Sequence, residues 1–328
     1  MKTTFNWGII GPGKIAKQFA ADLQYIPEAR LHAVASRESS RAKSFAEAFE
    51  APFHFGDYQS ILECPDLDAI YVATPHVGHF DNTINCLEAH IPVLCEKPLA
   101  MNYRQVELLI DTARRTNTFL MEALWTRFLP STQLLLELIR RGEIGELMGA
   151  KADFGFRADL PPEDRIFNKA LGGGALLDIG IYPVFLSLLL FGKAGEIKAM
   201  AKMGSTGVDE DTHVLLRYPG GQLAQLHSSF LADTKREAFI YGETGTIHMQ
   251  AEWYQQTQLS IFRGNSTPET HTIEPKGLGY HYEAQEVMNC LAKGKIESDQ
   301  LSHAFSTALI LSLDDIRREI GLIYPEDE

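Results

Sequence analysis

The feature that most constrains the fold is a strand, a glycine-rich turn and a helix, in that order, at the start of the chain. Residues 5–10 form an apolar run typical of a buried strand, and residues 11–16 follow at once with the sequence GPGKIA. Behind this turn, apolar residues recur at helical spacing, at Ile15, Phe19, Leu23 and Ile26. The order predicts the first strand–helix unit of a parallel sheet.

The small residues of this turn suit the approach of a dinucleotide. Gly11 permits the tight turn, Gly13 lets the backbone approach a pyrophosphate, and Ala16 allows close packing of helix on strand. The helix start at Lys14 and Ile15 would offer N–H groups and a positive dipole end to the phosphates. A P-loop is excluded, because the required glycine spacing and the following Ser or Thr are absent. A purely structural turn is the alternative.

The end of the second expected strand, residues 31–35, indicates which dinucleotide binds. An Asp or Glu at this place would accept a hydrogen bond from the ribose 2′-hydroxyl of NAD. This chain has Ser36, which leaves room for a 2′-phosphate, followed by Arg37 and Arg41, which can pair with it. We therefore expect NADP. The alternative is that both arginines are surface charges of a helix over residues 39–49.

Strands and helices continue to alternate up to residue 123, which predicts a doubly wound parallel (Rossmann) domain over residues 1–123. The expected strands are 53–55, 69–73, 92–95 and 119–122, and the expected helices are 58–63, 80–90 and 103–116. The carboxyl ends of parallel strands meet at one edge of a sheet. We therefore expect the residues after residue 73 to line the cofactor there, namely Thr74, Pro75, His76 and His79.

The fifth strand ends abruptly in an acid, a base and a proline, Glu96, Lys97 and Pro98. A buried parallel strand emerges in this way at the edge where α/β proteins bind ligands. Lys97 is then placed at the rim of a cleft, and Pro98 restricts how the backbone leaves the strand. A solvated strand end is the alternative. For Glu96 we expect a contact to the cofactor ribose or to a neighbouring side chain.

The second half, residues 124–328, changes character to α+β. A triple glycine at residues 172–174, interpreted as a flexible entry, leads into an apolar helix over 175–191. Asp178 and Tyr182 are four residues apart in that helix and so share one face. A buried carboxylate and phenol need partners, which indicates a pocket. A packing role for Tyr182 is the alternative at this point.

Most of this half alternates between strands and glycine turns, which predicts a large, open, mostly antiparallel sheet. The expected strands are 146–157, 197–202, 212–218, 222–230, 237–241, 246–250, 259–263 and 270–273, with helices over 131–141, 282–293 and 303–320. Helices would cover one face of this sheet and leave the other to meet a second subunit, so we expect a homodimer. The last helix could also pack back on the first domain.

Charge and cysteine content narrow the class of protein. The net charge of −13 argues against nucleic acid or an anionic membrane as the main partner. The four cysteines show no Cys-x-x-Cys spacing, so we expect reduced, mostly buried thiols and no metal site. Residues 1–4 lead straight into the first strand without a signal peptide, and we see no apolar run of membrane-spanning length. We expect a cytoplasmic protein.

Three motifs together resemble the glucose–fructose oxidoreductase / inositol dehydrogenase (Gfo/Idh/MocA) family. They are GPGKIA at residues 11–16, EKP at 96–98 and GGGALLDIG at 172–180. Within that family the chain is most similar to the dimeric trans-dihydrodiol dehydrogenases, which also act as NADP-dependent D-xylose dehydrogenases. That likeness rests on MEALWTRF at 121–128, DIGIY at 178–182 and IGLIYP at 320–325.

The resemblance implies an NADP-dependent oxidoreductase acting on a sugar, polyol or cyclic diol. Most members of the family have a histidine four residues after the aspartate, whereas here the residue is Tyr182, as in dihydrodiol dehydrogenase. The resemblance makes Tyr182 the acid–base residue, assisted by Lys97, with Asp178 orienting the substrate or Lys97. It also implies a cis peptide bond between Lys97 and Pro98. Arg165 matches an arginine that contacts the cofactor in relatives, although Asp164 replaces the usual tryptophan before it.

The look-alike enzymes also suggest an apolar wall for the substrate. Trp125 and Phe154 are the candidates for it, and for Trp253 a core or interface role is an equal alternative. Two other functions stay open from the sequence. One is an NAD-dependent glycoside hydrolase of the same family, and the other is a non-catalytic NADP-binding sensor. Ser36, Arg37 and Tyr182 count against the hydrolase, and the intact catalytic set counts against the sensor.

Overall fold

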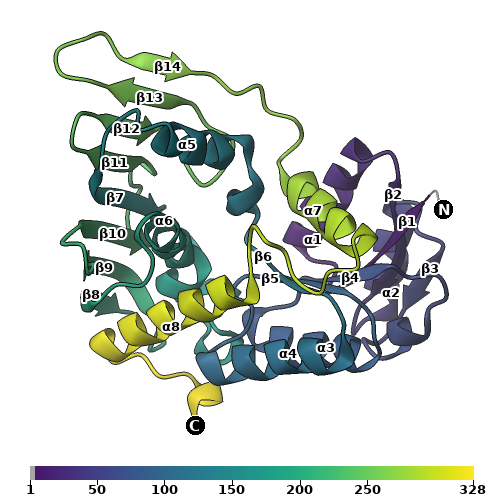
Figure 1. Ribbon diagram of the computed structural model, residues 1–328. Helices are drawn as coiled ribbons and strands as arrows, with labels where there is room; N and C mark the ends of the chain where they lie inside the picture. The colour runs from purple at the N-terminus through teal and green to yellow at the C-terminus, as the bar shows by residue number, and fades with distance from the viewer. Residues whose placement is uncertain (1–3) are drawn as a thin grey trace. The chain divides into compact units, whose positions relative to one another are not determined.

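The computed structural model describes residues 4–328, whose helices and strands are labelled in Figure 1. The chain divides into two compact units: Met1–Trp125 with Lys276–Thr307, and Thr126–Pro275 with Ala308–Glu328. Residues 1–3, where we expect no signal peptide, lie outside the described residues. The boundary after residue 123 remains our proposal for where the nucleotide-binding segment ends.

The first unit is built on a six-stranded sheet in the order β3-β2-β1-β4-β5-β6. Its strands are β1 (Phe5–Ile10), β2 (Ala29–Ala35), β3 (Phe53–Phe55), β4 (Ala69–Val72), β5 (Val93–Glu96) and β6 (Leu120–Ala123). Every neighbouring pair is parallel. Because helices cover both faces, β4, β5 and β6 are buried along their whole length. The predicted doubly wound sheet is confirmed.

The helices of the first unit are α1 (Lys14–Asp22), α2 (Ser39–Ala48), α3 (His79–Glu88), α4 (Tyr103–Thr116) and α7 (Tyr280–Ala292), with the start of α8 (His303–Ile320). The return of α7 to this unit depends on one side chain. Asp22, at the end of α1, accepts hydrogen bonds from the backbone N–H groups of Gly279 at 2.6 Å and Tyr280 at 2.8 Å. A carboxylate thus satisfies the exposed N–H groups at the start of α7.

The second unit is built on an eight-stranded sheet in the order β14-β13-β12-β11-β7-β10-β9-β8. Its strands are β7 (Leu147–Gly155), β8 (Glu196–Met203), β9 (Asp209–Arg217), β10 (Leu223–Ser229), β11 (Ala238–Gly242), β12 (Thr246–Met249), β13 (Leu259–Phe262) and β14 (Glu269–His271). All pairs are antiparallel except β10 with β7. The expected mostly antiparallel sheet is confirmed.

Helices cover only one face of this second sheet. α5 (Pro130–Arg140) and α6 (Ile181–Phe191) lie on the same side of it (Figure 1). Along β9, Thr212, Val214 and Leu216 are buried, whereas His213 and Leu215 are exposed. Since side chains alternate between the two faces of a strand, the second face carries the exposed set and is open.

The apolar helix of this unit departs from the sequence-based expectation in two ways. Leu176–Gly180 is a π-helical turn, and the α-helix begins only at Ile181. Pro183 explains the change, because it has no N–H to donate to Ile179 four residues earlier. Helical residues 169–191 also form a stretch long and apolar enough to cross a membrane by length and composition, contrary to our expectation, but 78% of its apolar window is buried.

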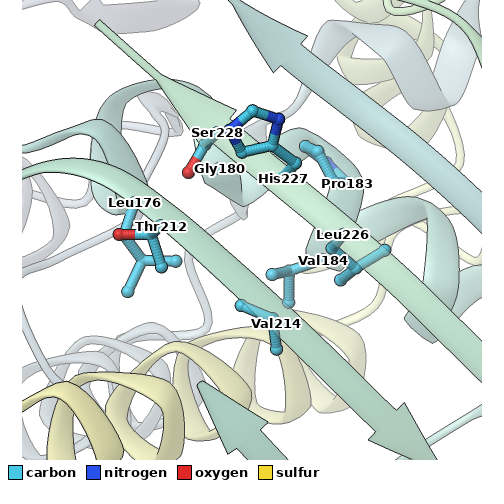
Figure 2. Close-up of a pocket in the computed structure, with 9 residues that line it drawn as sticks. All are labelled: Leu176, Gly180, Pro183, Val184, Thr212, Val214, Leu226, His227 and Ser228. Carbon is cyan, nitrogen blue, oxygen red and sulfur yellow. The ribbon is translucent and has the colours of Figure 1, made fainter. Parts of the chain in front are cut away.

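A small pocket lies between this helix and the sheet (Figure 2). Its walls are Leu176, Gly180, Pro183, Val184, Thr212, Val214, Leu226, His227 and Ser228. The lining contains no residue predicted to act in binding or catalysis. We therefore assign this cavity to imperfect packing of helix on sheet.

Candidate active site

The turn after β1 has the geometry that a bound pyrophosphate requires. Gly11 has φ of +90°, and a Cβ there would lie 2.8 Å from the carbonyl oxygen of Ala73, so only glycine fits. A Cβ on Gly13 would instead meet nothing closer than the carbonyl oxygen of Gly11 at 4.0 Å. Space at Gly13 is therefore left for a ligand, as the motif predicts.

The helix that follows leaves its first N–H groups available. α1 begins at Lys14 with Gly13 as its N-cap, and no side chain among the described residues caps it. Ala16 is fully buried, which allows the close helix–strand contact. Lys14 is exposed and Ile15 is half-buried. The helix start can therefore donate backbone hydrogen bonds to an anion.

The end of β2 carries two cationic side chains. Arg37 and Arg41 are exposed, and neither forms an ion pair with any residue from 4 to 328. Ser36 is 4% exposed, and its Oγ accepts a hydrogen bond from the N–H of Glu38 at 3.3 Å. Because no acidic side chain pairs with these arginines, both guanidinium groups are available to a phosphate.

The stretch after β4 contains one solvent-shielded histidine with a positioning role. His79 is fully buried, and its ring nitrogens lie 2.7 Å from the carbonyl oxygen of Pro98 and 2.9 Å from that of Thr74. The imidazole therefore links the exit of β4 to the exit of β5. We expected His79 to line the cofactor, but its complete burial assigns it to holding this edge together. His76 is 4% exposed and packs edge-on against it, and Pro75 is half-buried.

The Glu96–Pro98 stretch is held by hydrogen bonds to its acid. Glu96 is 7% exposed, and Tyr71 on β4 donates its hydroxyl proton to Oε1. The Lys97 N–H donates to Oε2 of the same carboxylate at 3.2 Å. Lys97 itself is half-buried. The Lys97–Pro98 peptide bond is cis, which confirms the prediction made from the resemblance.

Two further buried carboxyl groups near this stretch were not singled out from the sequence. Glu122 on β6 accepts from the N–H of Leu99 at 2.9 Å, and burial raises its pKa to about 7. Glu283 on α7 is fully buried, and neither of its oxygens has a hydrogen-bond partner among the described residues. Burial, then the nearby Glu96 and Asp22 carboxylates, hold the pKa of Glu283 well above its usual range. No local motif distinguishes these acids, because only the fold brings them together.

Trp125, predicted as a wall of the substrate pocket, is 7% exposed in the first unit. Its ring stacks on Tyr280 at 4.5 Å between centroids and an interplanar angle of 2°. Tyr280 comes from the segment that begins α7, where spacing arguments predicted nothing. Tyr280 is 5% exposed, so both rings are largely buried against each other.

In the second unit, Asp178 and Arg165 are paired. One guanidinium nitrogen, Nη2 of Arg165, lies 3.2 Å from each carboxylate oxygen of Asp178. The Asp178 side chain is 13% exposed and that of Arg165 38%. Asp178 lies in the π-helical turn and Tyr182 in the first turn of α6. The ion pair therefore holds the acid next to the helix start that carries Tyr182.

Tyr182 belongs to a cluster of three aromatic rings. It is 7% exposed and packs at 5.6 Å against both Phe154 and Tyr254, which stack on each other at 3.7 Å. Phe154 was predicted as a wall residue, whereas Tyr254 was missed. Trp253 is fully buried and donates its Nε1–H to the Asp153 carbonyl at 2.9 Å, so it is a core residue.

The triple glycine before this helix is packed tightly, which corrects our interpretation of it as a flexible entry. A Cβ on Gly174 would lie 2.4 Å from Oδ1 of Asp209 and 2.9 Å from the hydroxyl of Tyr324. Tyr324 in turn donates its hydroxyl proton to the carbonyl of Gly173. The buried Asp209 accepts from the N–H of Leu176 at 2.8 Å, and burial raises its pKa to about 6. Close approach, not mobility, requires glycine here.

The family of the chain follows from comparison with known proteins. A family profile described as "Oxidoreductase family, NAD-binding Rossmann fold" matches residues 5–124, and the "GFO/IDH/MocA C-terminal domain" profile matches residues 132–248. The trans-1,2-dihydrobenzene-1,2-diol dehydrogenase of Danio rerio is 38% identical and covers 98% of both chains. This chain therefore belongs to the Gfo/Idh/MocA oxidoreductase family, and it is an enzyme acting on CH–OH groups.

Solved structures of related enzymes agree with this assignment. A 3-ketoreductase from Actinomadura kijaniata, in complex with NADP and TDP-benzene, is 28% identical with a TM-score of 0.87, over 97% of this chain and 98% of that one. A levoglucosan dehydrogenase in complex with NADH and levoglucosan shares the fold, with a TM-score of 0.88 at 20% identity over 97% of both chains. The class of cofactor is therefore a nicotinamide dinucleotide.

Proposed function

We propose that this chain is an NADP(H)-dependent oxidoreductase that interconverts a secondary alcohol and a carbonyl on a sugar or a cyclic trans-diol. The observation that carries the proposal is the surroundings of Tyr182. Its ring is packed among Phe154 and Tyr254, and the preceding helical turn carries Asp178 in an ion pair with Arg165. A phenol hydroxyl on an apolar aromatic cluster suits proton exchange with a ring-shaped alcohol.

The residues at the carboxyl edge of the first sheet fit a dinucleotide with a 2′-phosphate. Gly11 and Gly13 leave space for the pyrophosphate, and the uncapped start of α1 offers N–H donors to it. Arg37 and Arg41 supply two charges for the 2′-phosphate, beside the small Ser36. When bound, this cofactor would supply the hydride acceptor or donor. Contacts from Lys14, Ile15, Ala16, Thr74, Pro75, His76, Glu96, Lys97 and Arg165 complete the proposed binding set.

Proton transfer is assigned to Tyr182. Oxidation of an alcohol releases the hydroxyl proton, and the phenolate of Tyr182 accepts it; in the reverse direction the phenol donates it to the carbonyl oxygen. A free tyrosine titrates near ~10, so a neighbouring ammonium is needed to favour the phenolate at neutral pH. Lys97 is assigned that part and also a hydrogen bond to the substrate hydroxyl. Asp178 orients the substrate or Lys97.

The substrate class follows from the aromatic surfaces. Each unit contains one stacked aromatic pair, Trp125 with Tyr280 in the first and Phe154 with Tyr254 in the second. We propose that Trp125 and Phe154 contact the ring carbons of a sugar or cyclic diol, while Tyr182, Lys97 and Asp178 supply the polar contacts. We further propose that the enzyme is a homodimer through the open face of the second sheet and acts in the cytoplasm, without a nucleic-acid or membrane partner.

The test is a panel of pentoses, hexoses and cyclic trans-diols, with reduction of NADP⁺ and NAD⁺ followed by absorbance. We expect at least one compound to be oxidised, with higher kcat/KM for NADP⁺ than for NAD⁺. Tight NADPH binding without oxidation of any compound would contradict the proposal in favour of a sensor. Cleavage of a glycoside with retained NAD would contradict it in favour of a hydrolase.

A further inference from the structure

Three side chains with metal-ligating atoms meet on the open face of the second sheet. Asp211 and His213 lie two residues apart on β9, so they point to the same face. His227 on β10 is the direct cross-strand partner of His213, and Ser229 is that of Asp211. The strand register therefore brings together two imidazoles and a carboxylate that are separated by up to 16 residues in the chain. Their ligating atoms all lie within 4.8 Å of one another.

The distances match those around a tetrahedral ion. The Nε2 atoms of His213 and His227 each lie 3.3 Å from the same carboxylate oxygen, Oδ1 of Asp211. Zinc–nitrogen and zinc–oxygen bonds of about 2.1 Å at tetrahedral angles place neighbouring ligand atoms about 3.4 Å apart. The two distances from Oδ1 of Asp211 to the histidine nitrogens thus match the spacing of ligand atoms around a zinc ion.

The carboxylate is held in place by a second contact. Ser229 donates its hydroxyl proton to Oδ2 of Asp211 at 2.6 Å, and its oxygen accepts from the N–H of Leu231 at 3.1 Å. The contact with Ser229 thereby orients the carboxylate, whose Oδ1 and Oδ2 lie 3.3 Å and 3.4 Å from Nε2 of His227. Hydrogen bonds of this kind orient the ligands of metal sites.

The imidazole rings of His213 and His227 lie face to face. The two rings stack at 3.9 Å with an interplanar angle of 11°, so one of them must rotate for both nitrogen lone pairs to meet a single ion. His213 is able to do this, because its side chain is 58% exposed.

We propose that Asp211, His213 and His227 bind one divalent transition-metal ion, with zinc as the ion of matching geometry. Two imidazoles and one carboxylate form a known type of zinc ligand set, with the fourth position left to water. The site lies on the face of the sheet opposite to the buried side chains of β9, such as Val214. The inference uses none of the residues assigned to cofactor or substrate, and the site lies on the same open face of the sheet as the proposed dimer interface.

The test is calorimetric titration of Zn²⁺ into the chelator-treated full chain. We expect one ion per chain, with binding weakened more than ~100-fold in His213→Ala and in His227→Ala, because each loses a direct ligand. His248→Ala is the matched control: this histidine on β12 lies 3.5 Å from Glu237 and stacks on Phe239, away from the proposed ligands. It should bind zinc as the wild type does.

A second measurement uses Co²⁺, because its visible absorption shows whether the ion is bound by a small number of ligands in tetrahedral geometry. The absorption should appear with the wild type and His248→Ala and be lost in a His213→Ala/His227→Ala double variant. All four cysteines are buried, so thiolates do not compete for the ion. Failure of the wild type to bind Zn²⁺, or equal binding by the double variant, would overturn the proposal.

Discussion

Tyr182 is the residue that we propose for proton transfer. Its ring is held in place by contacts with Phe154 and Tyr254. Lys97 follows the last residue of β5, and its backbone N–H donates a hydrogen bond to the Glu96 carboxylate. Both residues are assigned to the reaction, because a base and a cation are needed to remove a hydroxyl proton at neutral pH.

Removing either group should therefore abolish turnover while leaving the cofactor bound. We expect Tyr182→Phe and Lys97→Met each to lower kcat by at least ~100-fold, the usual contribution of general acid–base catalysis. Affinity for NADP⁺, measured by calorimetry, should stay near the wild-type value in Tyr182→Phe. Two residues outside the proposed site provide the controls Tyr103→Phe and Lys43→Met; Tyr103 is half-buried on α4 and Lys43 is exposed on α2. Near-wild-type turnover in Tyr182→Phe would refute the assignment.

We propose that single residues also decide the choice of cofactor. Arg37→Ala should raise the KM for NADP⁺ by ~10-fold or more, since a hydrogen bond between charged groups contributes about 1.5–3 kcal/mol. The KM for NAD⁺ should not change, because that cofactor lacks the 2′-phosphate. Lys43→Ala is the control, since Lys43 lies on the following helix α2 and pairs with Glu47 at 3.9 Å. An equal effect of Arg37→Ala on both cofactors would show that the arginine does not read the 2′-phosphate.

At the scale of elements, Glu122 joins three segments of the first unit. Glu122 lies in β6. Its carboxylate accepts one hydrogen bond from the N–H of Leu99, after β5, and one from the hydroxyl of Ser306, in the first turns of α8, at 2.6 Å. Burial raises its pKa to about 7, above the ordinary value of 4.5. The folded chain therefore keeps a proton that the unfolded chain releases between these two values.

This raised pKa gives a stability profile with a defined sign. The stabilisation that the protonated Glu122 contributes is fully present below pH 4.5 and is lost as the pH rises through 7. The loss corresponds to about 3 kcal/mol in the free energy of unfolding. Glu122→Gln should flatten the fall in stability between pH 5 and 8, measured by urea denaturation. A residual slope is expected, because Asp209 has its pKa raised to about 6. Identical pH profiles for variant and wild type would contradict this account.

At the scale of the whole molecule, the open face of the second sheet is the largest unpartnered feature. Its exposed apolar side chains are Met200, Leu215, Leu223, Tyr241 and Phe262. Leu215 is 60% exposed in the middle of β9. Large exposed apolar patches mark interaction surfaces, and a second copy of the same face is the partner that symmetry favours.

We expect the chain to be a dimer by light scattering, and Leu215→Arg to convert it to a monomer. The physical reason is that a charge on each subunit would be buried without a partner in the paired face. Leu108→Arg on α4 is the control, since Leu108 is 45% exposed in the other unit. A dimer that survives Leu215→Arg would place the interface elsewhere.

The sequence alone determined the features that depend on local chemistry. Patterns of neighbouring residues predicted the strand–turn–helix at Gly11, the hydrophobic strands of both sheets and the lysine after β5. The cis proline after β5 was predicted from the family resemblance. Helix and strand periodicity were sufficient for both sheets, because apolar side chains repeat with the spacing of the buried face. The π-helical turn before Tyr182 was missed, because Pro183 interrupts a pattern that otherwise reads as one helix.

The tertiary structure decided what depends on residues far apart in the chain. Glu283 and Tyr280 join the first unit because α7 packs on it, with Asp22 bound to the start of α7 and Trp125 stacked on Tyr280. The Asp211, His213 and His227 cluster exists only because the strand register places His227 opposite His213. Residue spacing along the chain cannot predict such groups. The neighbours of a residue across strands or between helices are determined by the packing of the whole unit.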